Sequence, residues 1–151
     1  SAAGSPPRLL DMGVEPFLLT SALNAVVGQR VVRKLCQRCK TDYAAPPEVR
    51  ENIKQVLGKI LPVSLTSANM KLYKGKGCQF CGNTGYLGRI GIYEVLVVTD
   101  TIAKLVLEHA SSGAIEEAAV AAGMITMKQD GYMKVLEGIT TMEEVLRVAQ
   151  D

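Results

Sequence analysis

The sequence predicts an α+β fold that is mainly helical and that includes one metal-binding arm. Two observations predict the fold class: a β-rich run at residues 89–98, and a C-terminal third in which capping residues separate short amphipathic helices. A third observation predicts the arm, because all four cysteines occur as two Cys-x-x-Cys pairs. With 151 residues, 48% of them hydrophobic, the chain has enough material for one ordinary core and a small satellite around a metal.

The first 35 residues are expected to hold a long buried helix. Residues 1–7 are small and Pro-rich and predict an irregular lead-in. Glu15-Pro16 then opens a helix, because Pro is tolerated at the first helical position. Apolar side chains at residues 17–27 cover most of the helix circumference, which is typical of a helix buried in a larger body. The apolar stripe narrows over residues 28–35 and continues to the first cysteine pair.

The two cysteine pairs, Cys36 with Cys39 and Cys78 with Cys81, predict one structural zinc site. A two-residue spacer turns both thiolates of a pair toward one point, and four sulfurs complete the tetrahedral coordination that Zn²⁺ prefers. No coordination position is left for water or substrate, which indicates a structural rather than a catalytic metal. Two disulfides or a dithiol redox centre fit less well, because nothing resembles a signal peptide and a redox centre needs no second pair. An iron–sulfur cluster held by the same four thiolates stays open as an alternative.

The predicted arm covers residues 36–88. Pro46-Pro47 starts a short helix that ends at Gly58, and residues 70–73 predict a strand. The arm has few long apolar runs, so we expect metal removal to loosen it while the helices after Thr99 persist. One Zn²⁺ with four thiolates has a formal charge of about −2, which nearby basic residues can partly neutralise. These residues are Arg38, Lys40, Lys74, Lys76 and Arg89.

Residues 89–98 predict a strand that is apolar on both faces at its end, as is typical of a strand with partners on both sides. Few other strands are visible, so we expect those partners in sequence outside this chain. Four short helices are predicted in residues 99–151. Thr99-Asp100 caps the first, and Thr140 with Glu143 matches the capping-box spacing before the last.

Composition argues against several classes of protein. The net charge of +2 is too small for a dedicated nucleic-acid binder, and 5% aromatic residues make stacking on bases or sugars a weak hypothesis. No apolar run reaches the roughly 18 residues that span a bilayer. We therefore expect a protein of a reducing compartment, without a transmembrane segment. Arg30 and Arg33 suit either a contact with a phosphate or neighbouring subunit, or a solvated basic face.

Several stretches together resemble one family. Residues 8–17 (RLLDMGVEPF) and 26–36 (VVGQRVVRKLC) resemble the C-terminal part of the type II secretion and type IV pilus assembly ATPases. Residues 77–81 (GCQFC), followed by Gly85–Arg89 and Ile92-Tyr93-Glu94, resemble the tetracysteine arm of that family and the strand that returns to its core. Residues 124–131 and 138–146 resemble its helical tail, so that the likeness covers nearly the whole chain.

The resemblance implies that the chain is the C-terminal fragment of a RecA-like P-loop ATPase domain with an inserted zinc arm and a helical tail. Residues 1–35 are then the end of the ATPase core, residues 36–88 the zinc arm, residues 89–98 a core strand, and residues 99–151 a C-terminal helical subdomain. The implied parent is a cytoplasmic homo-hexameric motor at the inner membrane. It hydrolyses ATP with Mg²⁺ and transmits motion to an inner-membrane platform protein, without nucleic acid as a partner.

The chain departs from the family pattern in one respect. It contains no GxxxxGK[ST] phosphate loop, so we assign no catalytic residue and expect no ATPase activity from this chain alone. The only residues assigned by the resemblance are the four zinc ligands. Arg30, Arg33 and Arg89 stand as candidate nucleotide or subunit contacts.

A second hypothesis is a free-standing zinc-knuckle module that binds nucleic acid or unfolded protein. Residues 78–85 (CQFCGNTG) support it, because they also resemble the cysteine-rich repeats of Hsp40 chaperones.

Overall fold

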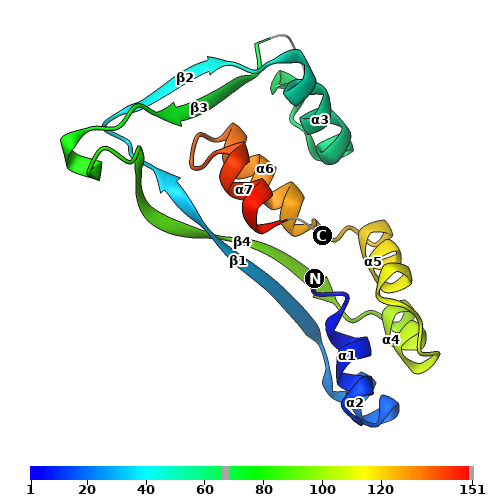
Figure 1. Ribbon diagram of the computed structural model, residues 1–151. Coiled ribbons are helices and arrows are strands. Elements are labelled where there is room, and N and C mark those ends of the chain that lie inside the picture. Colours follow the sequence, from blue (N-terminus) through cyan, green and yellow to red (C-terminus); the bar gives the residue numbers. More distant parts are fainter. Residues whose placement is uncertain (66–68, 150–151) are drawn as a thin grey trace. The chain divides into compact units, whose positions relative to one another are not determined.

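The computed structural model describes residues 1–65 and 69–149, and their order along the chain is shown in Figure 1. These residues form seven α-helices and two two-stranded sheets, and about half of them are helical. The α+β class is therefore confirmed, whereas the RecA-like origin stays a prediction. The helices are α1 (Ser5–Asp11), α2 (Pro16–Ala22), α3 (Pro47–Leu57), α4 (Asp100–Leu107), α5 (Ser112–Ala121), α6 (Met127–Leu136) and α7 (Met142–Val148). The strands are β1 (Ala25–Leu35), β2 (Lys40–Ala44), β3 (Lys71–Gly75) and β4 (Tyr86–Val97), and the 3₁₀ turns are η1 (Gly58–Ile60), η2 (Val63–Leu65) and η3 (Gln79–Cys81).

The described chain packs as two compact units. Unit 1 consists of residues 1–29 and 93–127, and unit 2 of Arg30–Ile92 with the helices that follow Met127. Each unit has its own hydrophobic core. The domain boundaries that follow from the resemblance stay predictions.

The predicted long helix between residues 16 and 35 is wrong. Helix α2 begins at Pro16 as expected, with Glu15 as its N-cap, but the chain leaves the helix at Leu23 and continues as β1. The four valines of β1 are β-branched and favour extended backbone, and the burial along its first half alternates with a period of two. Phe17 and Leu18, expected to be buried, are 67% and 62% exposed. The prediction that residues 1–7 are irregular is also wrong in part, because residues 5–11 form α1, which has Pro in its first turn.

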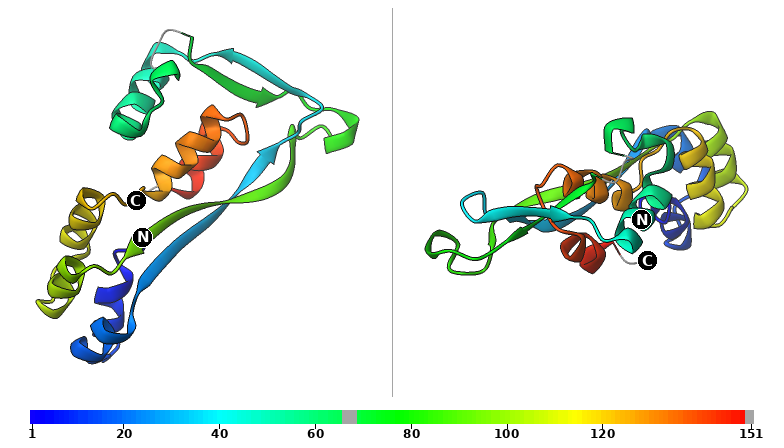
Figure 2. Two further views of the ribbon diagram at one scale, coloured as in Figure 1. Left: turned by 180° about the vertical axis from the view of Figure 1, so that it is seen from behind. Right: turned by 90° about the horizontal axis from the view of Figure 1, so that it is seen from above.

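Strands β1 and β4 pair along one sheet and run side by side in Figures 1 and 2. The amide of Val98 donates to the Asn24 carbonyl at the start of β1, and the amide of Cys36 donates to the Gly85 carbonyl at its end, so the two strands are antiparallel. For the described residues at the C-terminal end of β4, the prediction that both faces of the strand are buried is wrong. Leu96 is buried whereas Val95 and Val97 are 46% and 59% exposed, because only one face packs against helices. The other face would need a third layer, which the described part of the chain does not supply.

The core of unit 1 lies between the helices and the buried face of the strands. Its buried members are Ala2, Ala3, Leu19, Leu96, Ile102, Val106, Ile115 and Ala119. The predicted cap of α4 is confirmed, because the Thr99 hydroxyl accepts a hydrogen bond from the Ile102 amide at 3.3 Å. Helix α5 begins in the same way, with the Ser111 hydroxyl as acceptor for Ala114.

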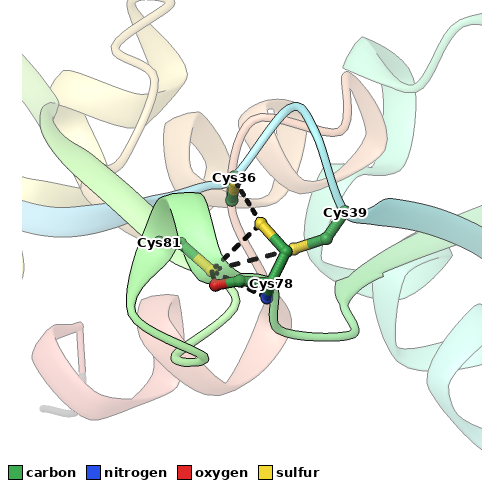
Figure 3. Close-up of side chains that lie close together, drawn as sticks. All are labelled: Cys36, Cys39, Cys78 and Cys81. Carbon is green, nitrogen blue, oxygen red and sulfur yellow. Dashed lines mark hydrogen bonds between the residues drawn. The ribbon is translucent and has the colours of Figure 1, made fainter.

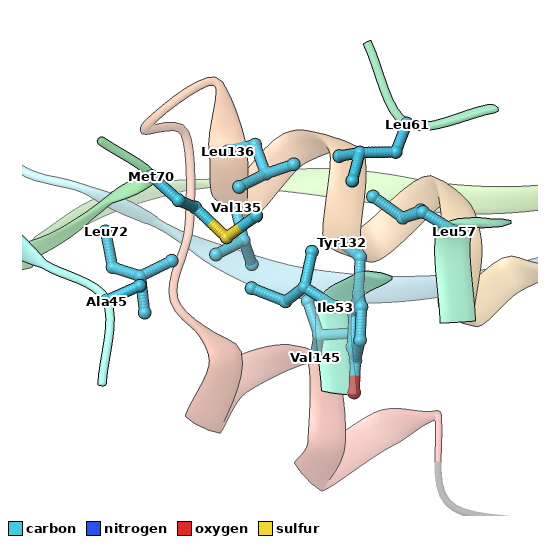
Figure 4. Packing of buried hydrophobic residues seen from close by; sticks show 10 residues of the cluster. All are labelled: Ala45, Ile53, Leu57, Leu61, Met70, Leu72, Tyr132, Val135, Leu136 and Val145. Carbon is cyan, nitrogen blue, oxygen red and sulfur yellow. The ribbon is translucent and has the colours of Figure 1, made fainter. Parts of the chain in front are cut away.

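The core of unit 2 joins segments from the predicted arm and from the C-terminal helices, as Figure 4 shows. Strands β2 and β3 form a two-stranded antiparallel sheet in which Lys40 faces Gly75 and Ala44 faces Lys71. Helix α3, confirmed with its end at Gly58, packs with this β2–β3 sheet against α6 and α7. The ten buried members are Ala45, Ile53, Leu57, Leu61, Met70, Leu72, Tyr132, Val135, Leu136 and Val145. The arm residues therefore share a core with α6 and α7.

Four helices follow β4, as predicted, but the cap of the last one differs by a residue. Thr141, not Thr140, is the N-cap of α7, and its hydroxyl accepts from the Glu144 amide at 3.3 Å. The hydroxyl of Thr140 donates instead to the carbonyl of Arg33 at 2.8 Å. A long-range contact has thus replaced the local cap that the spacing predicted.

Candidate metal centre

The four cysteines come together at the ends of β1 and β4, from two separate turns. Cys36 directly follows β1, and Cys39 ends the tight turn before β2, where its amide donates to the Cys36 carbonyl at 3.3 Å. Cys78 precedes the 3₁₀ turn η3, which ends at Cys81. The spacing of two residues places both sulfurs of each turn on its inner side, as Figure 3 shows.

The sulfur geometry matches a tetrahedral site for one ion. All four Sγ atoms lie within 4.8 Å of one another. The distance is 3.9 Å from Cys36 to Cys78, 3.9 Å from Cys39 to Cys81, and 3.7 Å from Cys78 to Cys81. Zn–S bonds of about 2.3 Å in a regular tetrahedron give sulfur separations of about 3.8 Å. The residues present therefore fit a Zn²⁺ ion.

The same distances bear on the alternatives. None of these pairs is a disulfide, since the S–S bond is about 2.05 Å long, and all four thiols are free. An iron–sulfur cluster places several iron atoms between its thiolates and needs a wider cage than one ion does. The close approach of all four sulfurs favours a single metal ion.

Backbone amides support the second pair in particular. The Sγ atom of Cys81 accepts hydrogen bonds from the amides of Cys78 at 3.3 Å and Gly85 at 3.2 Å. Burial raises the pKa of Cys81, but these amide donors together with the neighbouring thiols of Cys78 and Cys39 outweigh it and lower the pKa to about 6. Burial raises the pKa of the Cys39 thiol to about 11. A bound cation would hold all four sulfurs as thiolates, because the ligand form of cysteine is the thiolate.

Gly85 is the residue on which the two turns meet. Its amide donates to Cys81, and its carbonyl accepts from the amide of Cys36 at 2.9 Å. Its φ of +79° is strained for other residues, and an added Cβ would lie 2.7 Å from the carbonyl oxygen of Gly75. The close packing of two backbones at this position requires glycine.

Three of the basic residues predicted near the metal stack on aromatic rings. The Arg38 guanidinium lies 3.7 Å from the centre of the Phe80 ring, and Lys40 lies 5.1 Å from that of Tyr73. Lys74 lies 5.4 Å from the centre of the Tyr43 ring. Arg38 and Phe80 also line a surface hollow with Cys78 and Gln79, so that solvent reaches the site at Cys78.

The three candidate nucleotide or subunit contacts lie on β1 and β4, in unit 2. The guanidinium of Arg33 makes an ion pair with Glu144, with 2.7 Å between Nη2 and Oε1. Arg33 and Arg89 line one surface hollow together with Arg147. Arg30 is exposed on β1. Their proposed contacts stay predictions.

Comparison with known proteins places the chain in a family. The profile of the type II/IV secretion system protein family matches residues 1–147. The chain belongs to this family. It is 44% identical over 151 residues to the type II secretion system protein E of Xanthomonas campestris pv. campestris, covering 100% of this chain and 25% of that relative. It is 43% identical over 148 residues to the type IV pilus assembly ATPase PilB of Thermus thermophilus, covering 96% of this chain and 16% of that relative. It is 40% identical over 151 residues to the type II secretion system ATPase E of Vibrio cholerae serotype O1, covering 100% of this chain and 28% of that relative.

The chain therefore spans between 16% and 28% of the length of these secretion and pilus proteins. None of the helices described is long and apolar enough to cross a membrane.

Sequence reasoning missed Glu144, whose side chain is fully buried. Its carboxylate accepts from the side chains of Arg33 and Arg147 and from the Arg33 amide. Burial raises its pKa, but these donors outweigh it and lower the pKa to about 2. No local signal marks this residue, because its main partner lies 111 positions away in the chain.

The Glu144 network predicts a specific pH dependence of stability. A carboxyl whose folded pKa is below its ordinary value of 4.5 stabilises the fold above that value and loses its contribution as pH falls toward 2. The shift corresponds to about 3 kcal/mol at neutral pH. We expect Glu144→Gln to lower the free energy of unfolding by about that amount at pH 6, with the gap to wild type closing below pH 4.5. Urea unfolding of both proteins with chelator and reductant at each pH measures the gap, and a gap that stays constant down to pH 3 would contradict the prediction.

Proposed function

We propose that the chain is the C-terminal portion of an ATPase motor that powers type IV pilus assembly or type II protein secretion, with a structural zinc held by Cys36, Cys39, Cys78 and Cys81. The convergence of four free thiols at tetrahedral spacing is the observation that supports the metal. When bound, the zinc supplies a covalent tie between the two turns and no catalytic position, because all four ligands come from the protein.

Family membership and the relatives' names support the motor part of the proposal. Relatives of both kinds are named ATPases, and the chain matches them over nearly its whole length. In the parent we propose a cytoplasmic homo-hexamer that binds ATP and Mg²⁺ and acts on an inner-membrane platform protein. Exposed apolar side chains support burial against further parts of that parent, because Phe17, Leu18, Val27 and Val97 are each more than half exposed in the chain alone.

The experiment that tests this proposal combines metal analysis with an activity assay. The chain, purified under reducing conditions, is expected to contain one zinc per molecule by elemental analysis. With ATP and Mg²⁺ it is expected to release no phosphate above the rate without protein, because the sequence contains no GxxxxGK[ST] phosphate loop. Sustained hydrolysis by this chain would contradict the expectation that it is inactive without the phosphate loop. The lack of stoichiometric metal would contradict the structural zinc.

One observation favours the zinc-knuckle module as a second candidate. Residues 25–41 and 71–92, which contain all four cysteines, include nine Lys or Arg residues and no Asp or Glu. Two of the nine make ion pairs with carboxylates outside these ranges, Arg33 with Glu144 and Lys71 with Asp42. Such a basic segment with an Arg–Phe pair at its turn suits a polyanion. Fluorescence anisotropy with a labelled single-stranded oligonucleotide, and with a labelled denatured protein, distinguishes the zinc-knuckle module from the motor. Tight binding at physiological salt favours the module, whereas a phosphate loop in the coding sequence upstream favours the motor.

A further inference from the structure

Residues 138–144 contact the chain on both sides of the cysteine cluster, and we call this segment the clamp. It runs from the turn after α6 into the first turn of α7 and contributes no cysteine. All its contacts described below lie within unit 2.

On the β1 side, the clamp holds the backbone just before Cys36. The amide of Leu35 donates to the carbonyl of Ile139 at 2.8 Å, and the buried hydroxyl of Thr140 donates to the carbonyl of Arg33 at 2.8 Å. These two bonds fix the chain one and three residues before the first thiolate. The direction in which Cys36 leaves the strand is therefore set by the clamp.

Glu144 strengthens this attachment with charge-assisted hydrogen bonds. Its Oε2 atom accepts from the Arg33 amide at 2.8 Å, and its Oε1 atom accepts from the Arg33 guanidinium at 3.0 and 2.7 Å. Arg147 donates to the same carboxylate at 3.2 and 2.9 Å. A fully buried carboxylate with two guanidinium partners holds a backbone more firmly than neutral hydrogen bonds do.

On the β4 side, the clamp holds the residue after Gly85. The hydroxyls of Tyr86 and Thr141 are 2.9 Å apart and hydrogen-bonded, and the Arg33 guanidinium lies 4.2 Å from the centre of the Tyr86 ring. Gly85, directly before Tyr86, contacts both cysteine turns. By holding Tyr86, the clamp therefore also holds Gly85, which is hydrogen-bonded to both Cys36 and Cys81.

The clamp also reaches the end of the first cysteine turn. Lys40, the residue after Cys39, donates through Nζ to the carbonyl of Gly138 at 3.1 Å. The clamp therefore contacts residues next to Cys36 and Cys39, and it contacts the residue that follows Gly85. Groups that hydrogen-bond to the metal ligands themselves typically change metal affinity by 10- to 100-fold when they are lost, and the clamp acts on the backbone next to those ligands.

We propose that the clamp presets the geometry of the four thiolates, and that metal binding and the docking of α7 are therefore coupled. This inference rests on the zinc assignment made under Proposed function. Because coupling between two binding equilibria is reciprocal, a weakened clamp lowers metal affinity and loss of the metal loosens α7. Glu144 is a positioning residue in this arrangement.

The test compares two substitutions on one helix. Glu144→Gln removes the buried charge, whereas Glu143→Gln makes the same change at the exposed neighbouring position, whose side chain takes no part in the hydrogen bonds described above. Competition with a chromophoric chelator gives the zinc dissociation constant of each. We expect Glu144→Gln to raise the constant by about 10-fold or more, and Glu143→Gln to leave it within about twofold of wild type.

Two further readouts separate positioning from a general loss of stability. With cobalt in place of zinc, the visible bands of the tetrahedral sulfur site are expected to shift or broaden in Glu144→Gln at full occupancy and to stay unchanged in Glu143→Gln. In wild type, hydrogen exchange of the α7 amides is expected to accelerate when the metal is chelated.

Tyr86→Phe keeps the proposal testable if Glu144→Gln does not fold. It removes only the hydroxyl that bonds to Thr141 and keeps the ring beneath Arg33, so that a smaller loss of zinc affinity is expected. Failure of wild type to bind zinc would overturn the metal assignment itself. Normal zinc binding by wild type, with unchanged affinity in whichever of Glu144→Gln and Tyr86→Phe folds and with metal-independent exchange in α7, would overturn the clamp and leave the zinc assignment intact.

Discussion

Removal of the metal is expected to open the chain around both cysteine turns while α4 and α5 keep their protection from hydrogen exchange. Structural zinc in small peptides contributes roughly 10–16 kcal/mol of apparent binding free energy, far more than the local hydrogen bonds of two turns supply. Exchange rates in residues 36–40 and 78–86 are therefore expected to rise by about 100-fold or more. The apolar core formed by α3, β3 and α6 is expected to remain compact, because its members bury one another without the metal, whereas α7 is expected to exchange faster because its first turn is bonded to Arg33 and Tyr86 beside the cysteine turns.

Helices α4 and α5 serve as the internal reference for this experiment, because they belong to the other unit and to a separate core. Hydrogen exchange with and without chelator, under reducing conditions, gives both regions in one measurement. Cys36→Ser and Cys78→Ser, saturated with zinc, are expected to match chelated wild type in the turns. Unchanged exchange in both variants would show that the turns fold without a metal.

The sequence alone predicts that all helices after Thr99 persist when the metal is removed. Packing separates those helices into two groups. Leu136 and Val145, from α6 and α7, share a core with Ile53 and Leu72 of the predicted arm. A list of helices in chain order could not show this, because the contacts join segments some 80 residues apart.

The metal site itself was predictable because its signal is local. The spacing within each cysteine pair already fixes the turn, and two such pairs need only to meet. The hydrogen-bond network that surrounds the metal site was not predictable from the sequence. Glu144 looks like an ordinary acidic residue in the first turn of a helix, and only tertiary structure brings it to Arg33. Buried charge networks of this kind leave no pattern in the neighbouring sequence.

The error at β1 has a different cause. Residues 17–27 are almost continuously apolar, and such a run satisfies a helical and an extended pattern equally well. The deciding features were the β-branched valines after Asn24 and the two-residue alternation of burial that begins there. A second cause is that the β1–β4 sheet is only partly covered by other elements of this chain. Val27 and Val97 are apolar but exposed, so their apolar character did not indicate burial.

Tyr132→Ala is expected to be among the most destabilising single substitutions in unit 2. Tyr132 lies on α6 at the centre of the unit 2 core, is fully buried, and donates through its hydroxyl to Oδ1 of Asn52 on α3 at 2.7 Å. Truncating a buried aromatic side chain removes its transfer free energy and leaves a cavity, at a cost of about 3–5 kcal/mol. That loss is a large fraction of the roughly 5–15 kcal/mol that stabilises a typical domain. Urea unfolding followed by circular dichroism measures the change in the free energy of unfolding.

Two matched variants assign the effect to the ring rather than to the hydroxyl or to loss of any tyrosine. Tyr132→Phe keeps the ring and is expected to cost about 1 kcal/mol, because exposed Asn52 regains water as a partner. Tyr43→Ala removes a tyrosine that is 39% exposed on the β2–β3 sheet, and is expected to cost about 1 kcal/mol or less.

Because the core of unit 2 joins arm residues to α6 and α7, Tyr132→Ala should release the β2–β3 sheet and both helices in one transition. Separate transitions for the β2–β3 sheet and for α6–α7, in this variant or in wild type, would mean that the arm folds independently of the C-terminal helices.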